Sequence, residues 1–199
     1  MSQSSIATKV QLSAEEKLLR AIFGVAQSES HIEHPAPEPS RKYSWDVKLS
    51  NDYGTTVSVA FKHAYRADPM ELVTLVKRGV PAESVQALAK LMSISKERLA
   101  DTLGLASATV NRKSRDHKPL SSDESSRVVG MARLVGQVQA MVEESGDPEG
   151  FDAATWVAQW LEEPLPALGG RRPAELMDTP EGQSLVSNLV ARLQTGAYA

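Results

Sequence analysis

Hydrogen-bonding and basic side chains gather between residues 107 and 118. They are Ser107, Thr109, Asn111, Arg112, Lys113, Arg115 and Lys118. Hydroxyl, amide and guanidinium groups can hydrogen-bond base edges in the major groove of DNA, and Asn or Arg can do so with two bonds. The lysines and arginines that follow would mostly neutralise phosphates, which adds affinity without sequence information. The group therefore predicts a DNA-reading surface; for each single charge, the alternative is a solvated helix face.

The residues before this group predict the element that presents it. Leu99 and Leu103 are four positions apart and share one helix face. Gly104 follows, where a helix ends in the left-handed conformation that glycine adopts without steric cost. Ser107 is predicted to cap the next helix, whose Val110 points back towards the two leucines. This pattern is typical of a helix-turn-helix. The alternative is an ordinary helical hairpin in a small α-domain.

Other helices must support these two, because two helices alone cannot bury their apolar faces. Asp68 is predicted to cap a helix with Pro69 at its first position. Pro81 opens a second helix, and Ser95 caps the one that carries the two leucines. Residues 69–115 then hold four helices with short connections, which is what a compact helix-turn-helix domain needs.

The C-terminal part has its own helix signals. A capping box at Ser121–Glu124 begins a long apolar helix. Asp152 caps a shorter helix, with Phe151 packing on Trp156 as a hydrophobic staple. Trp156 and Trp160 lie one turn apart on one face, an arrangement more typical of a core than of a binding site. A last helix begins at Thr179 and Pro180, and its predicted apolar stripe is Leu185, Val186, Leu189, Val190 and Leu193.

Charge is distributed unevenly along the chain. Residues 1–59 carry a net charge of −1, residues 60–118 carry +5, and residues 119–199 carry −7. The basic middle suits phosphate contacts, whereas the acidic end would repel DNA. The two parts are therefore expected to face different partners.

Residues 1–64 are the least informative part. Ser13 and Glu16 form a capping box before a short apolar helix, and prolines 35, 37 and 39 predict an extended linker. Residues 57–61 alternate like a strand, with a helix over residues 56–65 as the alternative.

Composition excludes several classes of function. The chain has no cysteine, so disulfides and thiolate chemistry are excluded, and its four scattered histidines give no metal-ligand spacing. No glycine-rich phosphate loop, paired catalytic carboxylates or nucleophile constellation is present, so we expect neither an enzyme nor a cofactor. No apolar run approaches a membrane span and no signal peptide is evident, which predicts a cytoplasmic protein without a membrane partner.

A set of C-terminal residues resembles a known family. In order these are Ser126-Arg127, Trp160-Leu161, Pro164, Leu168-Gly169, Pro173-Ala174-Glu175-Leu176, Thr179-Pro180-Glu181-Gly182, Leu189-Val190-Ala191-Arg192-Leu193 and Gly196. The set resembles the toxin-binding domain of the Xre/ParS/MbcA antitoxins, a family that carries an Xre-like helix-turn-helix just before this domain. The resemblance covers roughly residues 65–199. Lys113 departs from it, since an apolar residue is usual there, and residues 1–64 lie outside the resemblance.

The resemblance implies a mainly α fold and an antitoxin of a type II toxin–antitoxin system. The partner would be a RES-domain toxin that degrades NAD or transfers ADP-ribose. The antitoxin would dimerise, bind the operator of its own operon and place C-terminal residues at the toxin's NAD pocket. Carried onto this chain, the toxin-binding residues are Gly169, Gly170, Arg171, Arg172, Pro173, Glu175, Arg192, Gln194 and Tyr198.

Two alternatives stay open. Arg171 and Arg172 could form surface salt bridges with Glu175 or Asp178 instead of facing a toxin. The whole chain could also be a stand-alone helix-turn-helix regulator whose C-terminal domain dimerises or binds an effector. The expected organisation is an N-terminal extension over 1–64, a helix-turn-helix domain over 65–119 and a toxin-binding domain over 120–199.

Overall fold

The computed structural model describes residues 61–145 and 150–194, and this part is mainly α-helical, as predicted. The helices are α3 (Pro69–Arg78), α4 (Glu83–Leu91), α5 (Lys96–Thr102), α6 (Ser107–Arg115), α7 (Ser122–Ser145), α8 (Ala153–Trp160) and α9 (Pro180–Gln194). Two short 3₁₀ turns, η1 (Pro166–Leu168) and η2 (Pro173–Leu176), lie between α8 and α9. Among the described residues, no helix has the length and apolar character to cross a membrane.

The expected N-terminal helix and proline-rich linker lie outside the described residues. Residues 61–66, where the description begins, are helical. The described part of the 56–65 segment thus agrees with the helical alternative and not with a strand. Lys62 holds this turn of helix to α7 through an ion pair of 2.8 Å with Glu143.

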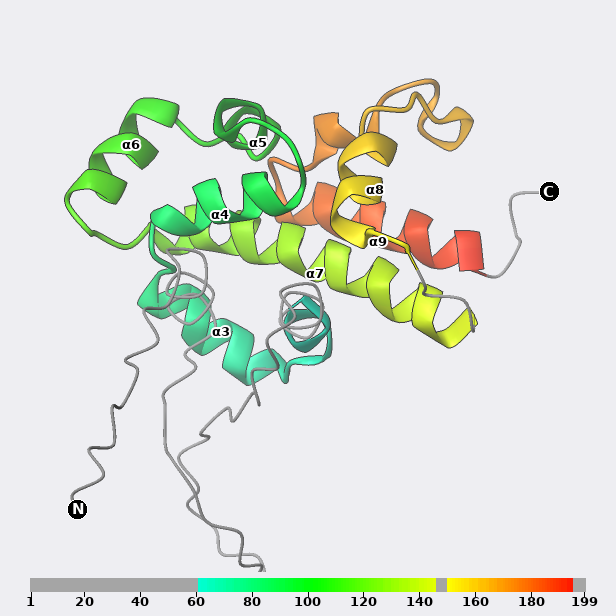
Figure 1. Ribbon diagram of the computed structural model, residues 1–199, viewed down its shortest axis with the longest axis horizontal. Coiled ribbons are helices and arrows are strands. Elements are labelled where there is room, and N and C mark those ends of the chain that lie inside the picture. Colours follow the sequence, from blue (N-terminus) through cyan, green and yellow to red (C-terminus); the bar gives the residue numbers. More distant parts are fainter. Residues whose placement is uncertain (1–60, 146–149, 195–199) are drawn as a thin grey trace, which may run out of the picture.

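Helix α7 is the scaffold on which the other helices pack. Figure 1 shows it running through the middle of the molecule, with α3 on one side and α4, α8 and α9 on the other. Because neighbours cover it from several directions, buried side chains extend along its length, including Val128, Met131, Val135 and Val138. Helices α5 and α6 lie beyond α4 at one end.

Local capping signals determine where most helices begin. The Asp68 carboxylate accepts a hydrogen bond from the Met70 amide at 2.8 Å, and the Ser95 hydroxyl accepts one from the Arg98 amide at 3.1 Å. Asp152 caps α8 in the same way, at 3.0 Å from the Thr155 amide. Such caps are each worth about 1 kcal/mol of stability.

The predicted cap of α6 is wrong. The N-cap residue is Ala106, which makes no side-chain capping bond, and Ser107 is already the first helical residue. At that position the backbone is helical, so the Ser107 hydroxyl cannot take the capping geometry, which needs an extended residue.

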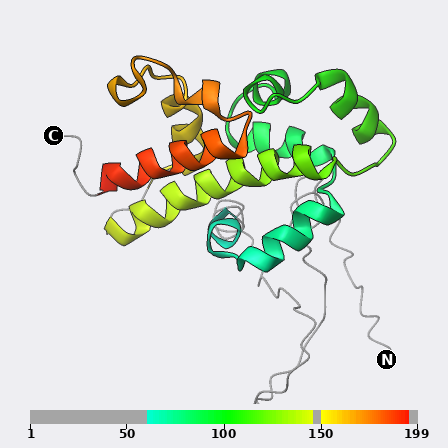
Figure 2. The same cartoon turned by 180° about the vertical axis from the view of Figure 1, so that it is seen from behind.

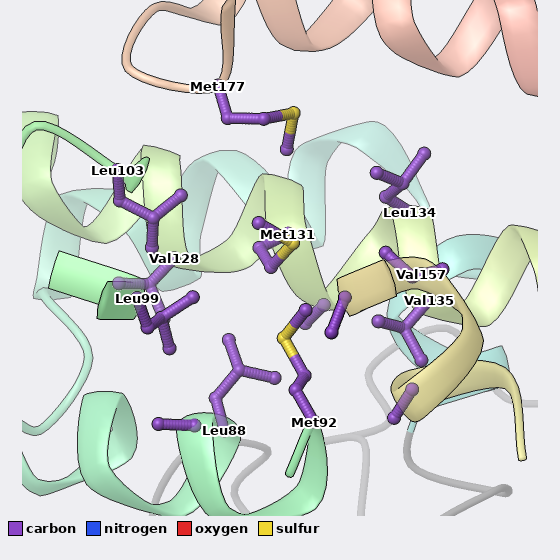
Figure 3. Packing of buried hydrophobic residues seen from close by; sticks show 14 of the residues in the cluster. Leu88, Met92, Leu99, Leu103, Val128, Met131, Leu134, Val135, Val157 and Met177 are labelled. Carbon is purple, nitrogen blue, oxygen red and sulfur yellow. The ribbon is translucent and has the colours of Figure 1, made fainter. Parts of the chain in front are cut away.

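One continuous core joins the helix-turn-helix to the C-terminal half. Figure 3 shows buried side chains from both parts converging around Met131 of α7. Leu88 and Leu99 approach from the N-terminal part, and Val157 and Met177 from the C-terminal part. The predicted domain border at residue 120 falls in the connection between α6 and α7, yet both sides contribute to the same cluster.

The predicted apolar stripe of α9 is only partly buried. Val186, Leu189 and Val190 are in the core, whereas Leu185 is 46% exposed and Leu193 is 40% exposed. Leu185 lies about 100° round the helix from Val186, and Leu193 lies in the last turn. Both therefore fall outside the reach of α7.

Candidate functional site

The α5–turn–α6 unit has the predicted helix-turn-helix geometry. Leu99, Leu103 and Val110 are each at most 1% exposed and hold the two helices together. Gly104 occupies the turn with φ +58°, the left-handed conformation predicted for it. The Leu105 amide donates to the Ala100 carbonyl at 2.7 Å, which closes the turn.

Helix α6 presents the predicted DNA-reading residues at one end of the molecule (Figure 1). Asn111, Arg112 and Arg115 are exposed, and so is Lys118 beyond the helix end. The other two polar residues of the set, Ser107 and Thr109, are half-buried in the first turn. The structure therefore brings the set together on α6 and just after its end, with Asn111, Arg112, Arg115 and Lys118 outermost.

Lys96 belongs to the same surface, although sequence reasoning did not include it. Its ammonium donates to the Asn111 side-chain oxygen at 2.5 Å. This contact uses the oxygen of the Asn111 amide as the acceptor, and the two hydrogens of its NH2 group remain the donors that the side chain could offer to a base. The two residues are fifteen positions apart on different helices, so no local pattern could have paired them.

Lys113 differs from the other basic residues of α6. Its ammonium lies 2.5 Å from a carboxylate oxygen of Glu124 in the first turn of α7, and both side chains are at most 21% exposed. Glu124 also accepts a hydrogen bond from the Ser121 amide at 2.7 Å, as the predicted capping box requires. This pairing explains how a lysine is accommodated at a half-buried position. Its expected phosphate contact stays a prediction, and it would require the ammonium to leave Glu124.

The Lys113–Glu124 pair should make stability depend on pH. Burial raises the pKa of Glu124, but the hydrogen bonds from Lys113 and Ser121 outweigh it, so the pKa is lowered from 4.5. A lowered folded-state pKa means stabilisation that is present above the unfolded value and is lost as pH falls through the folded value. We expect Glu124→Gln to cost about 1–2 kcal/mol at pH 7 in urea unfolding.

The difference between wild type and Glu124→Gln should close as pH falls below 4.5, where the wild-type carboxylate takes up its proton. The exposed Glu163 provides a matched control, because Glu163→Gln should leave the unfolding free energy almost unchanged at every pH. A difference for Glu124→Gln that is constant from pH 7 to pH 3 would contradict the assignment.

The loop after α8 forms the second candidate surface. The Leu165 amide donates to the Arg171 carbonyl at 3.0 Å and closes the loop at its base. Gly169 and Gly170 form its tip with φ of +66° and +83°, and Pro173, which follows the two arginines, is buried. Arg171 is exposed at the edge of this loop. Among the described residues, no ion pair involves its guanidinium.

Arg172 is part of an ion-pair network instead. Its guanidinium contacts Glu175 at 3.2 Å and Glu162 at 3.1 Å, and Arg98 of α5 contacts the other oxygen of Glu162 at 3.0 Å. The hydrogen bonds from Arg172 lower the pKa of Glu175. The salt-bridge alternative is thus confirmed for Arg172 with Glu175. Glu162 and Arg98 were not foreseen, because they are distant in sequence.

The remaining predicted toxin-binding residues belong to the C-terminal end. Arg192 is exposed on α9, Gln194 is the last described residue of that helix, and Tyr198 lies outside the described residues. Figures 1 and 2 show the loop and the end of α9 at the same end of the molecule, opposite α6. The described residues contain no group of three or more metal-ligating side chains that could hold an ion.

Comparison with known proteins identifies both halves. Residues 71–133 match the antitoxin Xre-like helix-turn-helix domain, and residues 146–196 match the antitoxin Xre/MbcA/ParS C-terminal toxin-binding domain. The two matches define a protein that joins a helix-turn-helix to a toxin-binding domain. The first match extends into α7, in agreement with the shared core.

Relatives confirm this classification over most of the chain. A protein of Sphingobium sp. (strain YBL2) named Prs ADP-ribosylating antitoxin is 45% identical over 144 residues, which is 72% of this chain and 91% of that protein. A protein of Yersinia enterocolitica named Antitoxin Xre is 26% identical over 167 residues, or 83% of this chain and 97% of that protein. The chain belongs to the Xre/MbcA/ParS family of antitoxins, as the sequence resemblance predicted.

Proposed function

We propose that this chain neutralises a RES-domain toxin that consumes NAD, and that its C-terminal region does so by covering the toxin's active site. The observation that carries the proposal is the exposed Arg171 on a closed loop at the same end of the molecule as the end of α9. A guanidinium presented in this way suits a pocket that binds pyrophosphate or carboxylate groups. The net charge of −7 over residues 119–199 favours rapid association with a basic toxin surface.

The name of the Sphingobium relative favours one of the two toxin chemistries. The name of that protein is Prs ADP-ribosylating antitoxin. For this chain we therefore propose a toxin that transfers ADP-ribose from NAD to a protein, in preference to one that only degrades NAD.

Growth rescue tests the proposal. The proposal expects a gene for a RES-domain protein beside the gene of this chain. Cells that express that protein should stop growing, and co-expression of the wild-type chain should restore growth. Arg171→Glu should weaken the rescue, whereas Arg133→Glu, at an exposed position of α7, should retain it. Failure of the wild-type chain to rescue would leave the stand-alone regulator as the better description.

The proposal also includes repression of the chain's own operon through DNA binding as a dimer. The exposed polar face of α6 supports it, because a monomer with one short reading helix would bind weakly. Each copy would read one half-site with α6 in the major groove.

Two arginines of α6 should have separable effects on DNA binding. If Arg112 makes a paired base contact, Arg112→Ala should weaken operator binding by about 1–3 kcal/mol and relax sequence preference. Arg115→Ala should weaken binding to all sequences alike. It should also lower the slope of log affinity against log salt concentration by about 1. Titrations of operator and scrambled DNA at several salt concentrations would measure both. Unchanged binding by Arg112→Ala would remove this residue from the reading set.

A further inference from the structure

Arg127 of α7 reaches the turn of the helix-turn-helix. Its Nη1 donates to the carbonyl oxygens of Leu103 and Gly104, each at 2.8 Å. Its Nη2 donates to the Asp123 carboxylate at 2.5 Å, which fixes the orientation of the guanidinium plane. The Arg127 side chain is only 13% exposed. A planar group with five donors is suited to such a set of acceptors, and a lysine could not reproduce it.

The turn is closely packed on the side of this contact. A Cβ atom at Gly104 would lie 3.0 Å from Arg127 Nη1 and 3.0 Å from the Cβ of Asp178, just before α9. The turn therefore contacts α7, through Arg127, and the segment before α9, through Asp178. The carbonyls at the end of α5, which would otherwise face water, are bound by a charged donor.

A second contact connects Arg127 to α9. The Gln183 side-chain amide donates to the Arg127 backbone carbonyl at 3.0 Å and to the Met177 carbonyl at 2.9 Å. Gly130 leaves the room for this amide on α7, since a Cβ there would lie 1.7 Å from Gln183 Oε1. A series of hydrogen bonds thus runs from α9 through Arg127 to the turn before α6.

We infer that Arg127 and Gln183 are positioning residues for DNA reading, which hold the α5–α6 turn from helices α7 and α9. The apolar core fixes the distance between α5 and α6, because Leu99, Leu103 and Val110 are buried. It leaves the turn's carbonyls unbound, and these are what Arg127 holds. The inference rests on the proposed DNA binding, and it adds that the angle of α6 is determined outside the α5–turn–α6 unit.

Amide hydrogen exchange on the full chain tests the positioning role without DNA. The Arg127→Met variant keeps most of the aliphatic stem and removes the donors, and Gln183→Met removes only the second contact. Exchange at the Gly104 and Leu105 amides should accelerate about tenfold in Arg127→Met, since hydrogen bonds to charged groups are of that strength. It should accelerate less in Gln183→Met, while the amides of α8 serve as the measure of intact folding. Arg133→Met, at an exposed arginine of the same helix, should change exchange neither at the turn amides nor at the amides of α8.

DNA titration supplies the second readout. With DNA from upstream of the chain's coding sequence, Arg127→Met should bind on the order of tenfold more weakly, with an unchanged dependence of affinity on salt. A residue that contacted a phosphate would instead lower that salt dependence. Unaltered exchange at the turn in both variants, or a lowered salt dependence in Arg127→Met, would overturn the inference. If the wild-type chain binds no DNA, the proposed function fails, and the exchange result still decides whether Arg127 holds the turn.

Discussion

Removal of residues 193–199 is expected to abolish neutralisation of the proposed toxin while the antitoxin stays folded. The last buried side chain in the described part of α9 is Val190, and Leu193 is already 40% exposed. The deletion therefore removes no side chain that is buried among the described residues. It does remove the end of α9 together with the predicted contact residues Gln194 and Tyr198. Growth in co-expression with the toxin should fall to the level without antitoxin.

Folding and DNA binding provide the controls for this deletion. The melting temperature and the affinity for operator DNA should stay close to those of the full chain, because α6 lies at the opposite end of the molecule. Full protection by the shortened chain would exclude the tail from toxin blocking. The exposed loop with Arg171 would then carry the neutralisation alone.

Trp160→Ala should reduce the free energy of unfolding by about 3–5 kcal/mol, the usual cost of deleting a buried aromatic side chain. Trp160 is 6% exposed and stacks on Trp156, with ring centroids 5.8 Å apart and an interplanar angle of 11°. Phe151 adds the predicted staple, 6.3 Å from the Trp156 ring. Removal of the indole would leave a cavity beneath α8. Urea unfolding followed by circular dichroism would measure the loss.

The neighbouring Gln159 offers the matched control, since it lies on the exposed side of the same helix. Gln159→Ala should change the unfolding free energy by less than about 0.5 kcal/mol. A loss below about 1 kcal/mol for Trp160→Ala would mean that the ring contributes little to the core.

Features set by local chemistry were predictable from the sequence. Helix starts at Asp68, Ser95 and Asp152 depend on one side chain and an amide two or three residues away. The left-handed Gly104 and the buried faces of α5 and α6 are also encoded within twenty residues. These are the features that define the helix-turn-helix, which explains why its position could be read directly from the chain.

Features that depend on contacts between residues distant in the sequence could not be predicted. Ser107 was assigned as a cap because its residue type fits, although the chain enters α6 one residue earlier. The contacts of Lys113 with Glu124 and of Arg98 with Glu162 depend on how helices pack, and no spacing rule reveals them. Arg127 stood in the family motif, but only the packing of α7 against the turn shows what it holds.

The two candidate surfaces lie at opposite ends of one rigid core. Helix α7 spans the distance between them and shares buried side chains with both. Arg98 of α5 also meets Arg172 of the loop at a common partner, Glu162. The proposed DNA-reading and toxin-binding surfaces are thus separate and are built on the same helix.

The most direct test of neutralisation adds this chain stepwise to the proposed RES-domain toxin. The purified toxin is supplied with NAD and with a cell extract that contains the acceptor protein, and NAD consumption is followed. We predict that consumption falls in proportion to added antitoxin and stops at a fixed molar ratio. The Arg171→Glu chain should require a larger excess. NAD consumption that continues unchanged in the presence of excess wild-type chain would contradict the proposed antitoxin mechanism.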